Sequence, residues 1–158
     1  MGEVSPCDLG SLYLGVHHRL HKFVDEAMTE CGLSLSRTKV LMALGEGGPM
    51  KQATLATRLG FAARSVTDTV DTLEREGLAV RTADPHDRRA WIIEITPAGQ
   101  TALAKAQIVR TKLMEEIFGV IPPAHRQELA TTLTAISDAL DHQCAQKATS
   151  VKEDKDVK

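Results

Sequence analysis

Apolar side chains recur every three or four residues along most of the chain, which is the spacing of amphipathic helices. In the first half this pattern predicts helices over residues 8–30, 34–44, 52–59 and 62–76. Gly60 allows a tight turn between the last two of these helices, and Gly77 ends the second of them. Two short helices joined in this way indicate a helix-turn-helix.

The apolar spacing changes after Gly77. Short β-branched runs over 78–82 and 91–95 flank a stretch with proline and aspartate at 83–90, and together they predict a β-hairpin. The expected fold class is therefore mainly α with a small β-hairpin.

The outer helices, within residues 8–31 and 97–146, carry more apolar surface than the small middle unit can cover. Thr96-Pro97 starts the second group, because threonine can cap the first turn and proline has no N–H to leave unpaired. Exposed apolar stripes normally pack against a partner, so we expect these helices to form a homodimer. Residues 147–158 have mixed charge and no apolar period, which predicts a disordered tail.

Composition narrows the class of protein further. The formal net charge of -2 gives no global sign of nucleic-acid binding, although binding depends on local potential. No apolar stretch is long enough to span a bilayer and no signal peptide is recognisable, so we expect a cytoplasmic protein without a membrane partner. No catalytic or nucleotide-binding motif occurs, so we expect neither an enzyme nor a cofactor.

The helix over 62–76 carries the first group of residues expected to contact DNA. A helix-turn-helix places the N-terminal part of its second helix in the major groove. Arg64 offers a cation for a guanine edge or a phosphate, and Ser65, Thr67 and Thr69 offer hydroxyls for phosphates or bases. The alternative is a surface ion pair between Arg64 and Asp68, four residues later.

The loop of the predicted hairpin joins acidic and basic residues in the sequence DPHDRRA, residues 84–90. Arginine suits the narrow minor groove, where the potential of DNA is most negative. Asp84 and Asp87 can bond backbone N–H groups within the turn and pair with one arginine, so we expect them to shape the loop. At least one of Arg88 and Arg89 then remains to contact DNA.

Residues 55–99 resemble the winged helix-turn-helix of the MarR family of bacterial transcription regulators, most specifically in the 84–90 loop and in ITPAG at 95–99. The order of the flanking helices extends the resemblance to about residues 8–145. It implies a winged helix-turn-helix domain over 34–96, in an obligate homodimer that binds a pseudo-palindromic operator in double-stranded DNA, usually as a repressor.

The resemblance also implies roles for single residues. Arg88 would enter the minor groove, and Arg89 would brace the wing against acidic neighbours. Asp68 and Thr72 stand where the family often has basic residues, so the recognition helix departs from the family pattern.

Many relatives bind a small anionic aromatic or phenolic ligand between the dimer helices and the winged lobe, and the resemblance implies the same here. The candidate ligand-binding residues are His17, His21, Arg37 and Lys39, and the alternative is that they are solvated surface residues. Cys7, just before the first helix, is a candidate for redox sensing. Cys31 and Cys144 read as ordinary helix-end residues, and the three cysteines lack the spacing of a disulfide framework or zinc site.

Other interpretations use the same part of the chain. His17, His21 and Asp25 lie four residues apart, a spacing that suits metal ligands, but no fourth ligand is evident and no metal site is predicted. An enzyme would need His17, His18 and His21 with Asp25 or Asp8, and no motif supports one. A redox- or metal-responsive regulator of the same fold and a winged-helix module that binds protein stay open as alternatives.

Overall fold

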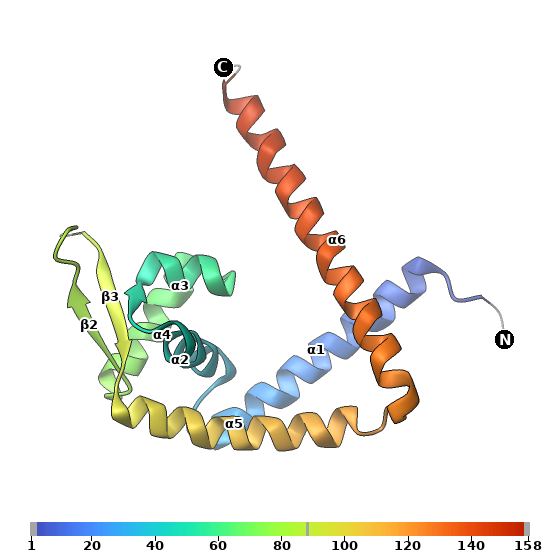
Figure 1. Cartoon of the computed structure of the whole chain (residues 1–158), viewed down its shortest axis with the longest axis horizontal. Coiled ribbons are helices and arrows are strands. Elements are labelled where there is room, and N and C mark those ends of the chain that lie inside the picture. Colours follow the sequence, from blue (N-terminus) through green and yellow to red (C-terminus); the bar gives the residue numbers. More distant parts are fainter. Residues whose placement is uncertain (1–2, 88, 157–158) are drawn as a thin grey trace. The chain divides into compact units, whose positions relative to one another are not determined.

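The structure, a computed structural model, describes residues 3–87 and 89–156, with side chains up to residue 146 (Figure 1). The chain forms two compact units, residues 1–114 and 115–158. The first contains α1 (Pro6–Glu30), α2 (Leu35–Gly47), β1 (Met50–Lys51), α3 (Gln52–Leu59), α4 (Ala63–Arg75), β2 (Ala79–Ala83), β3 (Trp91–Ile95) and most of α5 (Pro97–Phe118). The second contains the end of α5 and α6 (Pro123–Asp156). The predicted fold class, mainly α with a small β-hairpin wing, is confirmed.

The first unit is built around one hydrophobic core. α4 contributes Val66, Val70 and Leu73, which are 0% exposed and occupy the face that the apolar spacing predicts. Leu55 of α3 and Ile93 of β3 are equally buried in the same core. Figure 1 shows α2, α3 and α4 gathered beside the β2–β3 hairpin. The helix-turn-helix and the wing therefore pack against shared side chains.

The wing is a three-stranded antiparallel sheet in the order β1–β3–β2. Ile93 pairs with Arg81 of β2 on one side and with Met50 of β1 on the other. The sequence predicts the hairpin but not β1, because two residues are too few to show an alternating pattern. β1 continues directly into α3, so the third strand connects the sheet to the helix-turn-helix.

β3 passes into α5 through a single residue, Thr96. Its N–H donates to the Leu78 carbonyl at 3.1 Å, and its hydroxyl donates to the Gly77 carbonyl at 2.7 Å. The hydroxyl also accepts from the Gly99 N–H at 3.0 Å, which is the helix cap that the sequence predicts. Gly99 is buried, and a β-carbon there would overlap the Leu78 carbonyl oxygen and lie 2.8 Å from Ile95 Cγ1. α5 thus starts in close contact with the base of the wing.

α1 packs into the first unit near its C-terminal end, where Val24 and Met28 are buried. Asp25 Oδ1 accepts from the Leu35 N–H at 2.8 Å and so ties α1 to the start of α2. The rest of the helix leaves its apolar stripe exposed. The large apolar residues of α1 that are at least 45% exposed are Leu9, Leu12, Tyr13, Leu14, Val16 and Phe23.

In the second unit, α6 exposes an apolar stripe of its own, consisting of Leu129, Leu133, Ile136 and Leu140. The helix continues to Asp156, whereas the sequence predicts a disordered tail over 147–158. Residues 124–156 contain no glycine or proline, so no residue there breaks the helix. A segment without an apolar stripe has no face to bury, but its residues can still favour a helix. Within the described part of the chain, no helix is long and apolar enough to cross a membrane.

Candidate nucleic-acid interface

α4 presents a polar face opposite its buried stripe. Arg64 and Ser65, in its first turn, are exposed, and Thr67 and Thr69 are half-buried. The ion pair between Arg64 and Asp68 is not formed among the described residues. The guanidinium of Arg64 is therefore not neutralised by Asp68.

The threonine hydroxyls of this face donate to the helix backbone. Thr67 Oγ1 donates to the Ala63 carbonyl at 3.0 Å, and Thr69 Oγ1 donates to the Ser65 carbonyl at 2.7 Å. Thr67 also accepts from Gln52 Nε2 at 2.7 Å. Phosphate oxygens can only accept hydrogen bonds, so a hydroxyl with an engaged proton offers them nothing. Thr67 and Thr69 suit base amino groups better than phosphates.

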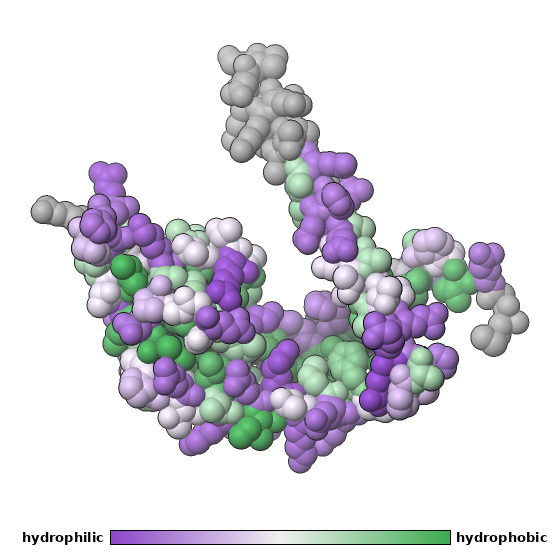
Figure 2. Space-filling model, viewed as in Figure 1, coloured by the Kyte–Doolittle hydropathy of each residue, from purple (hydrophilic) through white to green (hydrophobic). Residues whose placement is uncertain are grey.

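Both aspartates of the wing loop bond its backbone. Asp84 Oδ1 accepts from the His86 N–H at 2.8 Å, and Asp87 Oδ1 accepts from the Arg89 N–H at 3.0 Å. The Asp84 N–H donates to the Ala90 carbonyl at 3.0 Å, which closes the loop. Figure 2 shows hydrophilic residues gathered at this end of the wing. The aspartates thus hold the loop in a defined shape.

Asp84 also has a cationic partner that the sequence analysis does not identify. Lys51 Nζ of β1 lies 2.7 Å from Asp84 Oδ2, and the Asp84 side chain is only 4% exposed. The hydrogen bond from Lys51, followed by that from the His86 N–H, lowers the pKa of Asp84, and the same pairing raises the pKa of Lys51. Lys51 lies on β1, which is too short to predict, and Asp84 lies in the wing loop, so no sequence signal connects them.

Of the two arginines in the wing loop, the structure describes Arg89 but not Arg88. Arg88 lies outside the described residues, and its entry into the minor groove stays a prediction. Arg89 is exposed, and its side chain forms no ion pair with any described residue, so the brace that the resemblance implies is not formed there.

Arg81 of β2 instead ties the wing to α4. Its Nη2 lies 2.5 Å from Asp71 Oδ1, and its guanidinium lies 5.9 Å from the centre of the Trp91 ring.

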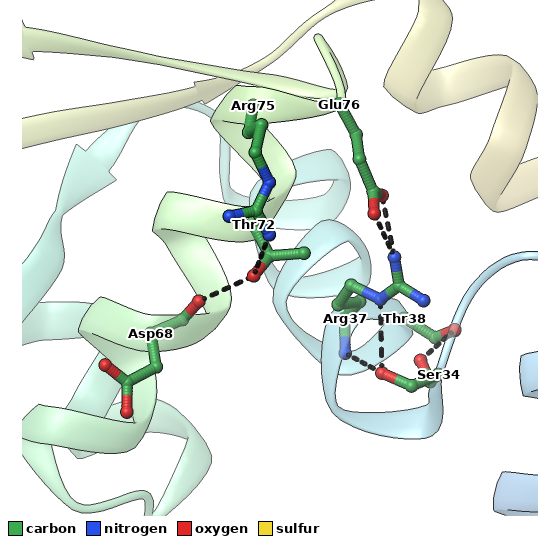
Figure 3. A network of polar contacts seen from close by, with 7 residues as sticks. All are labelled: Ser34, Arg37, Thr38, Asp68, Thr72, Arg75 and Glu76. Atoms are coloured by element: carbon green, nitrogen blue, oxygen red, sulfur yellow. Dashed lines mark hydrogen bonds and ion pairs between the residues drawn. The ribbon is translucent and has the colours of Figure 1, made fainter.

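The two basic residues expected to bind a ligand are engaged within the first unit. Arg37 Nη1 donates to both carboxylate oxygens of Glu76 at 2.7 Å, and Arg37 Nε donates to Ser34 Oγ at 3.3 Å (Figure 3). Lys39 Nζ lies 5.7 Å from the centre of the Phe61 ring. Arg37 thus joins the start of α2 to the C-cap of α4, and an anionic ligand would compete with Glu76 for it.

His17 and His21 are exposed on α1. Their ring centres are 6.2 Å apart, and the His17 ring stacks on Tyr13 at 6.1 Å. Asp25, the third residue of the candidate metal set, bonds the Leu35 N–H instead. In the part of the chain that the structure describes, no group of three His, Cys, Asp or Glu side chains could hold a metal ion.

Cys7 lies in the first turn of α1 and is exposed. The helix is capped by Ser5, whose hydroxyl oxygen accepts from the Asp8 N–H at 3.1 Å. An exposed thiol can be reached by oxidants, so redox sensing by Cys7 stays a prediction. Cys31 and Cys144 are exposed as well.

A helix-turn-helix packed beside a three-stranded wing, with an arginine-containing loop between β2 and β3, defines a winged-helix transcription regulator. The MarR family model matches residues 33–91, from just before α2 to the first residue of β3. The uncharacterised HTH-type transcriptional regulator YkoM of Bacillus subtilis is 30% identical over 104 residues, which cover 66% of this chain and 68% of YkoM. The chain belongs to the MarR family of transcription regulators, and these are not enzymes.

Other relatives and solved structures extend the similarity. The repressor IacR of Pseudomonas putida is 24% identical over 126 residues, covering 80% of this chain and 75% of IacR. BldR of Sulfolobus solfataricus is 28% identical with a TM-score of 0.74, over 86% of this chain and 99% of BldR.

Two more solved structures share the fold. A mutant MarR from E. coli complexed with operator DNA is 20% identical with a TM-score of 0.73, over 81% of this chain and 92% of that protein. BpsR of Bordetella bronchiseptica, whose DNA binding is regulated by 6-hydroxynicotinic acid, is 21% identical with a TM-score of 0.73, over 82% and 98%. The fold of these regulators therefore extends over most of the chain.

Proposed function

We propose that this regulator is a homodimeric repressor that binds a pseudo-palindromic operator through α4 and the wing. The observation that carries the proposal is the exposed polar face of α4 beside a loop that its own aspartates hold in shape. α4 would lie in the major groove, and the wing arginines Arg88 and Arg89 would reach the adjacent minor groove or its edge. The name of IacR as a repressor supports the direction of regulation.

The contacts from α4 would differ in kind. Arg64 suits a guanine edge or a phosphate, since no described acidic group neutralises it. Thr67 and Thr69 would accept from the amino groups of adenine or cytosine, because their protons are engaged by the helix backbone. Ser65, exposed in the first turn, would contact the backbone or a base.

A second copy of the chain is the proposed partner of the terminal helices, within residues 8–31 and 97–146. α1 and α6 each expose an apolar stripe at helical spacing, and such stripes normally pack against a partner. A two-fold dimer would place its recognition helices on half-sites about one helical turn apart.

The proposed signal is a small anionic aromatic molecule that releases the repressor from DNA. BpsR is regulated by such a molecule, an aromatic carboxylic acid. In this chain Arg37 would exchange the Glu76 carboxylate for that of the ligand, which would free the C-cap of α4. His17, His21 and Lys39 are the other candidate contacts.

The test is fluorescence anisotropy with labelled DNA from upstream of the chain's own gene, against a scrambled duplex of equal length. We expect preference for the promoter fragment and weaker binding after Arg64→Ala and Arg88→Ala, with a smaller salt dependence for each lost phosphate contact. Sedimentation of the free protein is expected to give a dimer. Equal binding to both duplexes would favour the alternative, a winged-helix module that binds protein.

A further inference from the structure

Asp68 is an exposed acidic residue in the middle of α4. At 3.6 residues per turn, its position is almost directly opposite the buried stripe of Val66, Val70 and Leu73. This is the face that enters the major groove in the proposed complex. Asp68 therefore brings a negative charge to the bases or to the phosphates of the DNA.

The Asp68 carboxylate has no partner among the described residues. The other acidic side chains of residues 63–76 all have cationic partners there: Asp71 and Glu74 meet Arg81, and Glu76 meets Arg37. Asp68 forms no ion pair with any residue that the structure describes. Figure 3 shows its carboxylate directed away from Thr72 and Arg75. The carboxylate is thus available to a group on the DNA.

The hydroxyl groups around Asp68 limit what that group can be. The protons of Thr67 and Thr69 are engaged by the helix backbone, as described above. Thr72 Oγ1 donates to the Asp68 carbonyl at 3.0 Å, so its proton is engaged as well. A phosphate facing residues 67–69 would meet only hydrogen-bond acceptors and the charge of Asp68. The middle of α4 therefore suits base amino groups and disfavours the DNA backbone.

Cytosine is the base that best matches a carboxylate. The amino groups of the major groove are cytosine N4 and adenine N6. Adenine N6 lies beside the acceptor N7, which repels a carboxylate, whereas cytosine presents only the N4 donor on its major-groove edge. We propose that Asp68 is a specificity-determining residue that accepts a hydrogen bond from cytosine N4, so that each operator half-site carries a C·G pair facing Asp68. This inference rests on the proposed function above.

The same carboxylate excludes other bases at that position. Thymine offers only the O4 acceptor and its methyl group, and guanine offers the acceptors N7 and O6. Neither gives Asp68 a donor, so the charge would be desolvated without a hydrogen bond. Asp68 therefore selects the operator by rejection as well as by attraction.

The first experiment selects bound duplexes from a random-sequence library with the full chain, Asp68→Asn and Asp68→Ala. We expect the unaltered protein to enrich a C·G pair at one position of each half-site. Asp68→Asn should shift that position to A·T, because an amide can bond adenine N6 and N7 together. Asp68→Ala should lose the preference at that position and keep the others.

The second experiment measures affinities by fluorescence anisotropy. Replacing the enriched C·G pair by T·A should weaken binding of the unaltered protein at least about fivefold, and that of Asp68→Ala less than about twofold. The ratio of the two affinities is the readout, because removing an acidic residue near DNA also strengthens binding to every duplex. The matched control is Glu30→Ala, which removes an exposed acid at the end of α1 and should keep the full ratio.

The outcomes separate this inference from the proposed function. The Asp68 carboxylate contacts no described residue, so its variants should keep the Tm of the unaltered protein. If all three proteins enrich the same sequence, the assignment of Asp68 is overturned and the regulator stands. If Asp68→Ala binds every duplex more tightly without a change in the ratio, Asp68 only repels phosphates, and the assignment is overturned as well. If none of the proteins enriches a sequence, both proposals fail.

Discussion

Replacing Gly99 by alanine is expected to lower the stability of the protein, whereas ordinary helix propensity alone would raise it. Replacing glycine by alanine inside a helix normally stabilises it by up to about 1 kcal/mol. At Gly99 the new β-carbon would overlap the Leu78 carbonyl oxygen and come within 2.8 Å of Ile95 Cγ1. Backbone atoms cannot rotate away as a side chain can, and forced overpacking of this kind costs about 1–3 kcal/mol.

The two effects give a net loss. We expect Gly99→Ala to lower the free energy of unfolding by about 1–2 kcal/mol, and a chain of this size loses about 2–4 °C of Tm for each kcal/mol. The expected fall in Tm is therefore about 2–8 °C. The assay is thermal unfolding followed by circular dichroism, at one fixed protein concentration because a dimer's Tm depends on concentration.

Gly45 of α2 is the matched control. A β-carbon at Gly45 would meet only Leu103 Cδ2, at an ordinary contact distance of 3.5 Å. Gly45→Ala should therefore raise Tm by about 1–4 °C. If Gly99→Ala is as stable as Gly45→Ala, the tight contact between the start of α5 and the base of the wing does not exist in the folded protein.

Three further predictions test the polar links and the dimer. The pKa of Asp84 is lowered in the folded protein, so the stability that it contributes is present above its unfolded pKa of about 3.9 and is lost as pH falls through the folded value. Asp84→Asn should therefore reduce the loss of stability that urea unfolding measures below about pH 5. Between about pH 5 and 9 both partners of the Lys51 pair stay charged, so the pH dependence of stability should be the same in the two proteins. Arg37→Gln should cost about 1 kcal/mol in urea unfolding, and the charge swap with Glu76 should restore part of it; equal stability of all variants would show that the pair contributes nothing. Leu133→Lys should weaken the proposed dimer at least about tenfold by sedimentation, and an unchanged dimer would exclude the α6 stripe from the interface.

The helices could be predicted because their apolar stripes are complete. The stripe of Val66, Val70 and Leu73 gave α4 to within a residue or two of its observed bounds, and Thr96-Pro97 marked the start of α5. β1 could not be predicted, since Met50–Lys51 is formed by pairing with β3 and has no local pattern of its own. The helical end of α6 could not be predicted from an apolar stripe, because a stripe marks a buried face and the helix continues to Asp156 without one.

The candidate site was predictable where partners are close in sequence. The bonds of Asp84 and Asp87 run to backbone groups two residues away, which is a local preference of aspartate. The partners of Lys51, Arg81 and Arg37 come from other elements, and only the packed fold decides which acid each arginine or lysine meets.

The connection between β3 and α5 is a single residue, so no flexible loop separates the wing from the start of α5. β3, five residues from Trp91 to Ile95, extends about 17 Å from Thr96. If the wing tilted by about 10° about Thr96, its far end would move by about 3 Å, half the width of a minor groove of about 6 Å. In the proposed complex, such a tilt would be enough to withdraw the tip of the wing from the DNA.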